Sequence, residues 1–260
     1  MIDAHLHLQH LPDKRVLEEI LRSASSRGLN LFFCNAIRID DFEFLNELAS
    51  GYSSVVPFYG IHPWASGKLE EGWDRGFEKF LKERVCGVGE IGLDRSKEID
   101  LSVQTAVFRR QMEIAAIHGK PVMIHCVQAW GEMMPILREY AVRVRFLLHA
   151  FRGSSEILSE IMKLGGWVTF SWKLFKQKYN EPFEKVVKLI RQVHPGRFLL
   201  ETDFPYVGAK VFSTLTAEQY FECIEETYRI AAEALGTEPD EFKERMKRNG
   251  KAFLHGTSDR

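Results

Sequence analysis

Ile2-Asp3-Ala4-His5-Leu6-His7 opens the chain as a short apolar strand that ends in histidines. Seven further apolar runs of strand length follow within the 260 residues, and longer amphipathic stretches separate them. The eight predicted strands begin near Ile2, Leu29, Val55, Val85, Val122, Phe146, Trp167 and Phe198. Because near-continuous apolar strands that alternate with helices are typical of parallel sheets covered by helices, the chain is predicted to be an α/β protein.

Eight strand–helix units favour a closed (β/α)8 barrel of the TIM type over an open, doubly wound sheet. An open dinucleotide-binding sheet normally carries a glycine-rich turn directly after its first strand. Here the glycine cluster Gly87-Val88-Gly89-Glu90-Ile91-Gly92 lies in the middle of the chain. We therefore predict one barrel domain, residues 1–260, with its active site at the carboxyl ends of the strands.

Capping signals define the two helices predicted near the end of the chain. Thr216 followed by Gln219 fits a capping box, which places a helix from there through Leu235. Pro239 is a favourable first residue for a second helix, and Asn249-Gly250 predicts the end of that helix.

The composition is that of an ordinary globular protein, with 45% hydrophobic and 27% charged residues and a net charge of −1. There is no surplus of basic residues to bind nucleic acid through phosphate neutralisation alone. If the substrate is a phosphodiester, bound metal cations would have to attract it. The cysteines at positions 34, 86, 126 and 223 form no Cys-x-x-Cys pair, which favours buried, reduced thiols.

The first residues of the chain and the length of its apolar runs bear on the cellular compartment of the protein. The first motif begins at Asp3, which leaves no room for a secretory signal peptide before it. No run approaches the ~18 apolar residues of a membrane span. We therefore expect a soluble, cytoplasmic protein without a membrane partner.

His5 and His7 are two residues apart on the first predicted strand, so both imidazoles point to the same side. In a barrel, that side is the interior or the mouth. Two inward histidines fill a core poorly and bind a metal well, although two hydrogen-bonded core histidines would leave the same pattern. Asp3 has the same parity and could orient the two rings from behind.

Four more apolar runs end in a side chain that can ligate a metal. These side chains are Glu90, His125, His149 and Asp203. A carboxylate carried into an apolar barrel without a partner is costly, and a cation is its natural partner. Imidazoles and carboxylates without a thiolate suit zinc, manganese or magnesium. Since six ligands exceed what one tetrahedral zinc needs, we predict two divalent ions that share Glu90.

Six short motifs occur in order along the chain. They are Asp3-Ala4-His5-Leu6-His7, Gly60-Ile61-His62-Pro63, Gly89-Glu90-Ile91-Gly92-Leu93-Asp94, Pro121-Val122-Met123-Ile124-His125, His149-Ala150-Phe151-Arg152-Gly153 and Glu201-Thr202-Asp203-Phe204-Pro205-Tyr206. Together they resemble the motifs of the TatD family of metal-dependent deoxyribonucleases, which belongs to the amidohydrolase-like barrels. The resemblance runs from Asp3 to about His255. It implies a hydrolase that cleaves phosphodiester bonds in DNA or short nucleotides with a metal-activated water.

The resemblance also implies a role for each site residue. The implied ligands are His5, His7 and Asp203 for one metal and His125 and His149 for the other. Glu90 would bridge the two metals and so take part in catalysis. Asp203 would also act as the general base, for which Glu201 is a weaker candidate, and His62 would contact the substrate.

Five positions depart from the family pattern. They are Arg95, Val127, Ala150, Arg152 and Phe204. An arginine is expected in the family where Val127 stands, and a guanidinium can clamp a phosphate with two parallel hydrogen bonds. We therefore expect Arg152 to bind the substrate phosphate in its place, and the alternative is a solvated Arg152 that pairs with Glu156.

The metal residues fit two other classes of function. An amidase, lactonase or deaminase could use the same metals on a small molecule, because the fold alone does not separate these enzymes. A non-catalytic binding protein is disfavoured, because it would keep buried carboxylates and imidazoles without a use for them.

Two aromatic features could contact nucleic acid. Trp64 and Trp130, which follow His62 and His125, could stack on a base or simply pack their loops. The basic and aromatic run at residues 172–176 could touch a nucleic-acid backbone or begin a solvated helix.

Overall fold

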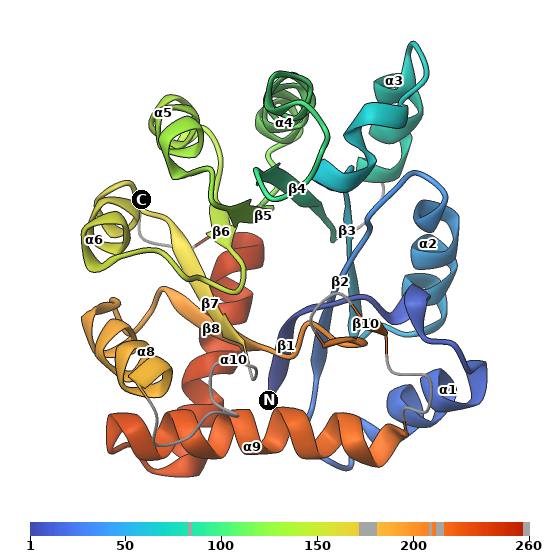
Figure 1. Cartoon of the computed structure of the whole chain (residues 1–260). Coiled ribbons are helices and arrows are strands. Elements are labelled where there is room, and N and C mark those ends of the chain that lie inside the picture. Colours follow the sequence, from blue (N-terminus) through green and yellow to red (C-terminus); the bar gives the residue numbers. More distant parts are fainter. Residues whose placement is uncertain (83–84, 172–180, 208–209, 212–215, 257–260) are drawn as a thin grey trace.

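The computed structural model describes residues 1–82, 85–171, 181–207, 210–211 and 216–256. Eight parallel strands follow one another in the order of the sequence, and helices surround them (Figure 1). The strands are β1 (Ile2–Leu6), β2 (Leu31–Asn35), β3 (Val55–Tyr59), β4 (Gly87–Asp94), β5 (Val122–Val127), β6 (Phe146–Leu148), β7 (Trp167–Ser171) and β8 (Phe198–Glu201). This confirms the predicted (β/α)8 barrel. Six strands begin at the predicted residue, and β2 and β4 begin two residues later.

The outer layer is built from amphipathic helices. The α-helices are α1 (Lys14–Ser23), α2 (Asp41–Gly51), α3 (Trp73–Glu78), α4 (Leu101–Ile117), α5 (Trp130–Tyr140), α6 (Ser155–Lys163), α8 (Glu181–Gln192), α9 (Ala217–Leu235) and α10 (Pro239–His255). The short 3-10 helices are η1 (Leu8–His10), η2 (Pro63–Lys68) and η3 (Lys79–Leu81), and a small antiparallel pair joins β9 (Tyr206–Val207) to β10 (Lys210–Val211). The predicted capping box of Thr216 and Gln219 begins α9, which ends at Leu235 as predicted.

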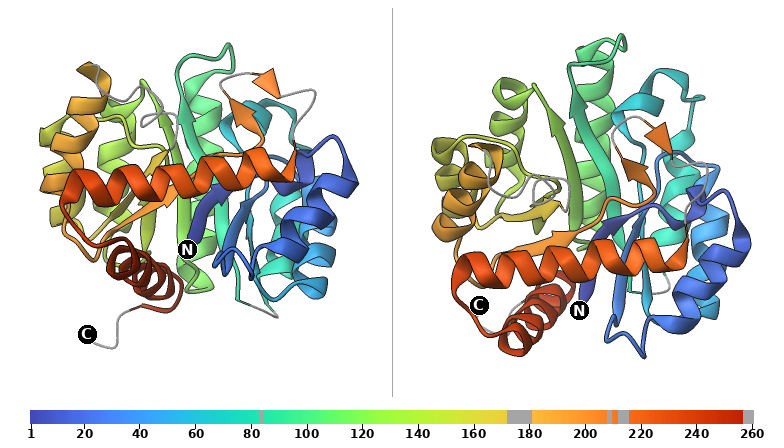
Figure 2. Two further views of the ribbon diagram at one scale, coloured as in Figure 1. Left: turned by 90° about the horizontal axis from the view of Figure 1, so that it is seen from below. Right: turned by 60° about the horizontal axis from the view of Figure 1, so that its bottom comes forward.

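Helix α10 covers the end of the barrel where the strands begin. It lies beside α9 and close to the N-terminus (Figure 2). The ring of Phe253 packs against Phe33, Phe58 and Trp167, with ring centroids 5.7–6.3 Å apart. Arg145 donates hydrogen bonds to the carbonyls of Phe253 and Leu254. The opposite end, where the strands finish, is therefore the end left for a site.

The predicted end of α10 at Asn249-Gly250 is wrong, because the helix continues to His255. The Asn249 side chain donates to the carbonyl of Phe198, and a Cβ on Gly250 would lie 2.4 Å from Cδ1 of Ile2. Both residues therefore serve the packing of the helix against the barrel rather than a cap. The helix ends before Gly256, whose φ is 82°.

The barrel closes between β1 and the segment that follows β8. The amide of Asp203 donates to the carbonyl of His5 over 2.9 Å, and the amide of His7 donates to the carbonyl of Phe204 over 2.7 Å. Asp203 has a φ of 59°, a left-handed conformation that aspartate tolerates better than most residues. Three of the four residues that close the barrel at this seam, His5, His7 and Asp203, are thus predicted metal ligands.

The glycine cluster at residues 87–92 has the Gly-x-Gly-x-x-Gly spacing of dinucleotide-binding turns, but it lies inside strand β4. At Gly92, whose φ is 147°, a Cβ would stand 1.9 Å from the carbonyl oxygen of His125. The glycine therefore allows β4 and β5 to approach closely at the level of the predicted ligands.

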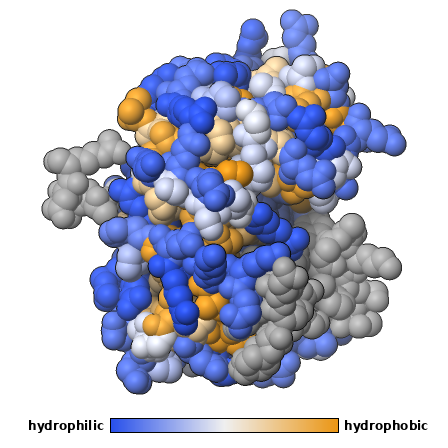
Figure 3. Space-filling model, turned by 60° about the vertical axis from the view of Figure 1, so that its left-hand side comes forward, coloured by the Kyte–Doolittle hydropathy of each residue, from blue (hydrophilic) through white to orange (hydrophobic). Residues whose placement is uncertain are grey.

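The surface drawn in Figure 3 is mostly hydrophilic, with hydrophobic side chains in small scattered groups. Among the described residues, no helix combines the length and apolar character needed to cross a membrane. The four cysteines are free; burial raises the pKa of the Cys34 and Cys126 thiols to about 12.

Candidate metal centre

Glu90 lies at the centre of the predicted ligands and is 2% exposed. Its Oε2 is 3.2 Å from Nε2 of His5 and 3.4 Å from Nε2 of His7. Its Oε1 is 2.8 Å from Nδ1 of His125 and 2.7 Å from Nε2 of His149. Each carboxylate oxygen therefore faces one pair of histidines, which is the arrangement that a bridging carboxylate requires.

Asp203 joins the pair formed by His5 and His7. Its Oδ1 lies 3.6 Å from Nε2 of His7 and 3.9 Å from Nε2 of His5. The Asp203 side chain is 17% exposed, compared with 3% for Glu90. It is thus the more accessible of the two predicted carboxylate ligands.

The histidine nitrogens converge as they would around cations. Nε2 of His5 and Nε2 of His7 are 3.1 Å apart, and Nδ1 of His125 and Nε2 of His149 are 3.0 Å apart. The triad of His5, His7 and Glu90 has its ligand atoms within 4.8 Å of one another. Imidazole nitrogens and carboxylate oxygens at this spacing fit divalent ions. The structure thus brings all six predicted ligands together, while their role as ligands stays a prediction.

Burial and mutual contact set the charges in the cluster. Burial lowers the pKa of His5 to about 3, so this ring is neutral near pH 7. Burial alone would raise the pKa of Glu90, but the surrounding histidines hold it well below its usual range. Burial would lower the pKa of His149, but the charges of Glu90 and Glu201 raise it well above its usual range. Because metals bind the neutral imidazole and the ionised carboxylate, metal binding would release a proton from His149.

Two further carboxylates lie behind the histidines of the second pair. Oδ2 of Asp94 is 3.3 Å from Nε2 of His125, and Oε1 of Glu201 is 3.4 Å from Nδ1 of His149. His125 therefore presents its Nδ1 to Glu90, whereas His149 presents its Nε2. Carboxylates in this position fix the tautomer and the orientation of a ligating histidine.

Hydrogen bonds keep these outer carboxylates in place. Burial would raise the pKa of Asp94, but hydrogen bonds from His125, Ser96 and Trp64 lower it. The hydroxyl of Thr169 donates to Oε2 of Glu201, which is fully buried. Glu201 thus lies behind His149 and away from solvent, which does not favour its predicted alternative role as general base.

Hydrogen bonds to groups outside the cluster hold His7 and Asp3 in place. Nδ1 of His7 lies 2.7 Å from the carbonyl oxygen of Asn35, which leaves Nε2 for the cluster. The Asp3 carboxylate accepts hydrogen bonds from the His5 amide, from the Thr202 amide and hydroxyl, and from the Tyr220 hydroxyl. Asp3 therefore fixes the backbone around the seam, and the prediction that it orients the imidazole rings is wrong.

The sequence profile of the TatD related DNase family matches residues 2–255. The chain belongs to this family. It is 26% identical over 211 residues to the 3'-5' ssDNA/RNA exonuclease TatD of Edwardsiella piscicida, with 80% of each chain covered. It is also 26% identical to the deoxyribonuclease TATDN3 of Homo sapiens, with 80% of this chain and 79% of the relative covered. The predicted family resemblance is confirmed.

Solved structures show how widely this fold is shared. A TatD homologue from Escherichia coli has a TM-score of 0.83 and 22% identity, with 99% of this chain and 98% of that chain covered. A phosphotriesterase homology protein from Escherichia coli, solved with phosphate in its active site, has a TM-score of 0.59 and 16% identity, with 78% of this chain and 81% of that chain covered. These likenesses show that this chain shares its fold with both of these proteins.

His62, predicted to bind substrate, lies inside the cluster and is 3% exposed. Its Nε2 is 3.3 Å from Oε1 of Glu90, and its Nδ1 accepts a hydrogen bond from the amide of Trp64. Burial lowers the pKa of this histidine to about 4. His62 thus reaches Glu90 from the side of η2, and substrate contact stays a prediction.

The altered family positions occupy different environments. Arg152 is exposed in the loop between β6 and α6, and Val127 is half-buried at the end of β5. Ala150 has a φ of 44°, and its amide donates to the hydroxyl of Thr169. Phe204 is 3% exposed and packs on Tyr220 with the ring centroids 4.9 Å apart, so its side chain serves packing at the seam.

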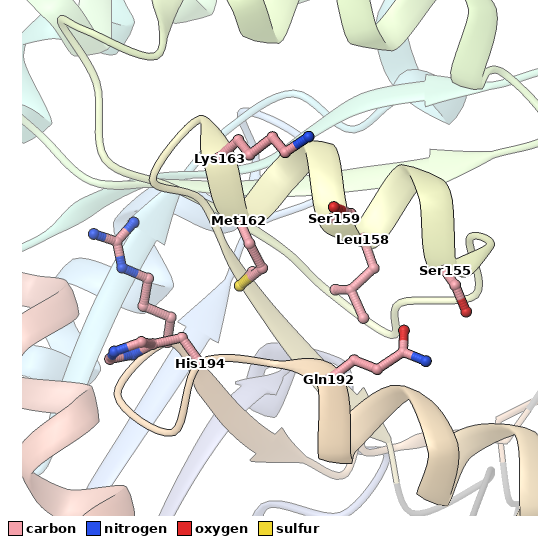
Figure 4. A pocket seen from close by; sticks show the side chains of 8 residues that line it. Ser155, Leu158, Ser159, Met162, Lys163, Gln192 and His194 are labelled. Atoms are coloured by element: carbon pink, nitrogen blue, oxygen red, sulfur yellow. The ribbon is translucent and has the colours of Figure 1, made fainter.

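The aromatic and basic run at residues 172–176 falls outside the described residues. A hollow of about 610 Å³ lies between α6 and α8 (Figure 4). The residues that line it are Ser155, Leu158, Ser159, Met162, Lys163, Gln192, His194 and Arg197. It contains none of the predicted site residues.

Proposed function

We propose that this chain is a divalent-metal-dependent phosphodiesterase that cleaves DNA or short nucleotides. The observation that carries this proposal is Glu90, whose two oxygens each face a separate pair of histidines. Two ions held in this way would supply Lewis acidity and an activated water, which suits the hydrolysis of phosphodiesters. The family to which the chain belongs is described as DNases, and two relatives are named as nucleases.

The residues divide into three roles in this proposal. His5, His7 and Asp203 hold one ion, and His125 and His149 hold the other, with Glu90 between them. Asp94 and Glu201 orient the histidines of the second ion. Asp203 takes a proton from the attacking water, because it is the more accessible carboxylate ligand and contacts both His5 and His7.

Two residues outside the set of metal ligands, His62 and Arg152, are proposed to contact the substrate. His62 is buried against Glu90 and would contact a phosphate oxygen near the ions. Arg152 lies three residues after His149, in the loop between β6 and α6, and is exposed, so its guanidinium would be available to bind a phosphate of the substrate.

The test is a panel of substrates given to metal-free protein after the separate addition of magnesium, manganese and zinc. The panel contains single-stranded and double-stranded DNA, amides and lactones. We expect metal-dependent cleavage of DNA and little turnover of the others. Turnover of an amide or lactone without any cleavage of DNA would favour the amidohydrolase alternative.

A further inference from the structure

A cavity of about 760 Å³ lies directly beside the predicted metal centre, between the β2–α2 loop, η2 and α3. Figure 1 shows α2 and α3 next to each other on this side of the barrel. His62 separates the cavity from the cluster, because its Nε2 faces Glu90 while the neighbouring residues Ile61 and Trp64 line the cavity. The volume falls within the range of roughly 300–1,000 Å³ that is usual for small-molecule sites.

One wall of the cavity is held firmly in place. The Asp41 carboxylate accepts hydrogen bonds from the amides of Ile37 and Arg38, at 2.7 and 3.2 Å. The carbonyl of Ile37 in turn accepts from the amide of His62 over 2.9 Å. The wall is therefore tied to the residue that borders the metal centre, so little ordering would be needed when a ligand enters.

Exposed hydrophobic side chains form part of the lining. Six large hydrophobic side chains are exposed among the described residues, and two of them, Ile39 at 41% and Trp64 at 38%, line this cavity. Leu69 and Trp73 also line it. Nζ of Lys97 lies 4.2 Å from the centroid of the Trp64 ring, so the indole already attracts a cation in this structure.

The charges of the lining do not favour a phosphate chain. Two cationic residues, Arg38 and Lys68, are opposed by three acidic ones, Asp40, Glu70 and Glu71. An occupant with several phosphates would gain nothing from this balance. A flat, uncharged ring with polar edges suits a lining of indoles and aliphatic groups rimmed by both signs of charge.

We propose that this cavity binds an unpaired nucleobase next to the phosphodiester that is cleaved. This inference rests on the proposed function and names the place where a base of its substrate is held. A base inside a duplex is stacked and paired and cannot enter a cavity without leaving the helix. The base that fits is therefore one of a single strand, and the cavity between η2 and α3 is the place that we assign to it.

Trp64 links the cavity to the metal centre and so makes a poor test position. Its Nε1 donates to Oδ2 of Asp94 over 2.7 Å, and Asp94 contacts His125. A change at Trp64 would disturb both sites at once. Gly76 of α3 is a better choice, because it lines the cavity and a Cβ there meets no atom within 4 Å.

The test replaces Gly76 by tryptophan, which would place an indole in the cavity. Gly51→Trp is the matched control, since this helical glycine of α2 also has open space around a Cβ and does not line the cavity. Two substrates are compared, a short oligothymidylate and an abasic deoxyribose-phosphate strand of equal length. We expect Gly76→Trp to lower kcat/KM for oligothymidylate at least tenfold, through KM, and to leave the abasic strand and the control unchanged.

Binding of the labelled oligothymidylate in the presence of a chelator gives a second readout without cleavage. Ile39→Asn, which makes the lining polar without filling it, should weaken that binding in the same direction as Gly76→Trp. Unchanged binding and cleavage in both variants would overturn the base site and leave the proposed function standing. Equal losses on the two strands would assign the cavity to the sugar–phosphate chain and overturn the proposal. Failure of the wild type to cleave either strand with any metal would overturn the proposed function together with this inference.

Discussion

The main-chain amide of Asp203 donates a hydrogen bond to the carbonyl of His5 over 2.9 Å. This bond connects the first strand of the barrel to the segment directly after the last one. The side chains of the same two residues are predicted to bind one metal. The predicted centre therefore lies where the barrel closes, so occupation by metal should stabilise that closure.

Metal removal should lower the melting temperature. A ligand that binds only the folded state adds about 2.7 kcal/mol when it is present at a hundred times its Kd. Differential scanning calorimetry with a chelator and with added manganese would measure the effect. If the protein melts at the same temperature with the chelator and with manganese, metal binding does not stabilise the closure of the barrel.

Asp203→Asn should lower phosphodiester turnover by about 10²–10⁴, the usual contribution of a general base. The amide keeps an oxygen for the metal but cannot take a proton, so metal content should fall less steeply than turnover. Both quantities would be measured on the same preparation. Turnover near that of the wild type would remove Asp203 from the chemistry.

Asp94→Asn and Glu201→Gln should each weaken metal affinity about 10–100-fold, because each carboxylate orients a histidine of the second ion. Competition with a chromogenic chelator gives the affinity. Asp240→Asn serves as the control, since that carboxylate is 94% exposed and far from the site in sequence, on α10. If the two variants match this control, the outer carboxylates do not act on the metal.

Arg152→Ala should reduce phosphodiester turnover at least tenfold, or about 1.4 kcal/mol in transition-state binding. Arg152 is exposed beside the strand end that carries His149, and alanine cannot make the phosphate clamp. Arg138→Ala is a suitable control, because that exposed arginine on α5 pairs with Glu160. Equal turnover in the wild type and Arg152→Ala would place the clamp elsewhere.

Much of this site could be predicted from the sequence because the ligands follow apolar runs. In a parallel barrel the carboxyl ends of all strands meet, so Glu90, His125 and His149 converge even though 59 residues separate the first from the last. Parity also gave a usable signal for Asp94, which lies four residues after Glu90 on β4 and therefore faces the same side.

Other features depend on tertiary packing and leave no local pattern. The contact of His7 with the carbonyl of Asn35 depends on the pairing of β1 with β2. The continuation of α10 past Gly250 depends on its approach to Ile2, whereas glycine in a sequence usually signals a helix end. Asp3 shares the parity of His5 but accepts hydrogen bonds from the Thr202 amide and the Tyr220 hydroxyl, which approach it from elsewhere in the chain.

The most direct test of the central claim is the number of metal ions bound per chain. Elemental analysis of dialysed protein would be made on the wild type and on His149→Ala, which removes a ligand from only one side of Glu90. Two ions in the wild type and one in the variant are expected, with the folded state retained by circular dichroism. An equal metal content in both proteins, or no bound metal in the wild type, would contradict a two-metal centre bridged by Glu90.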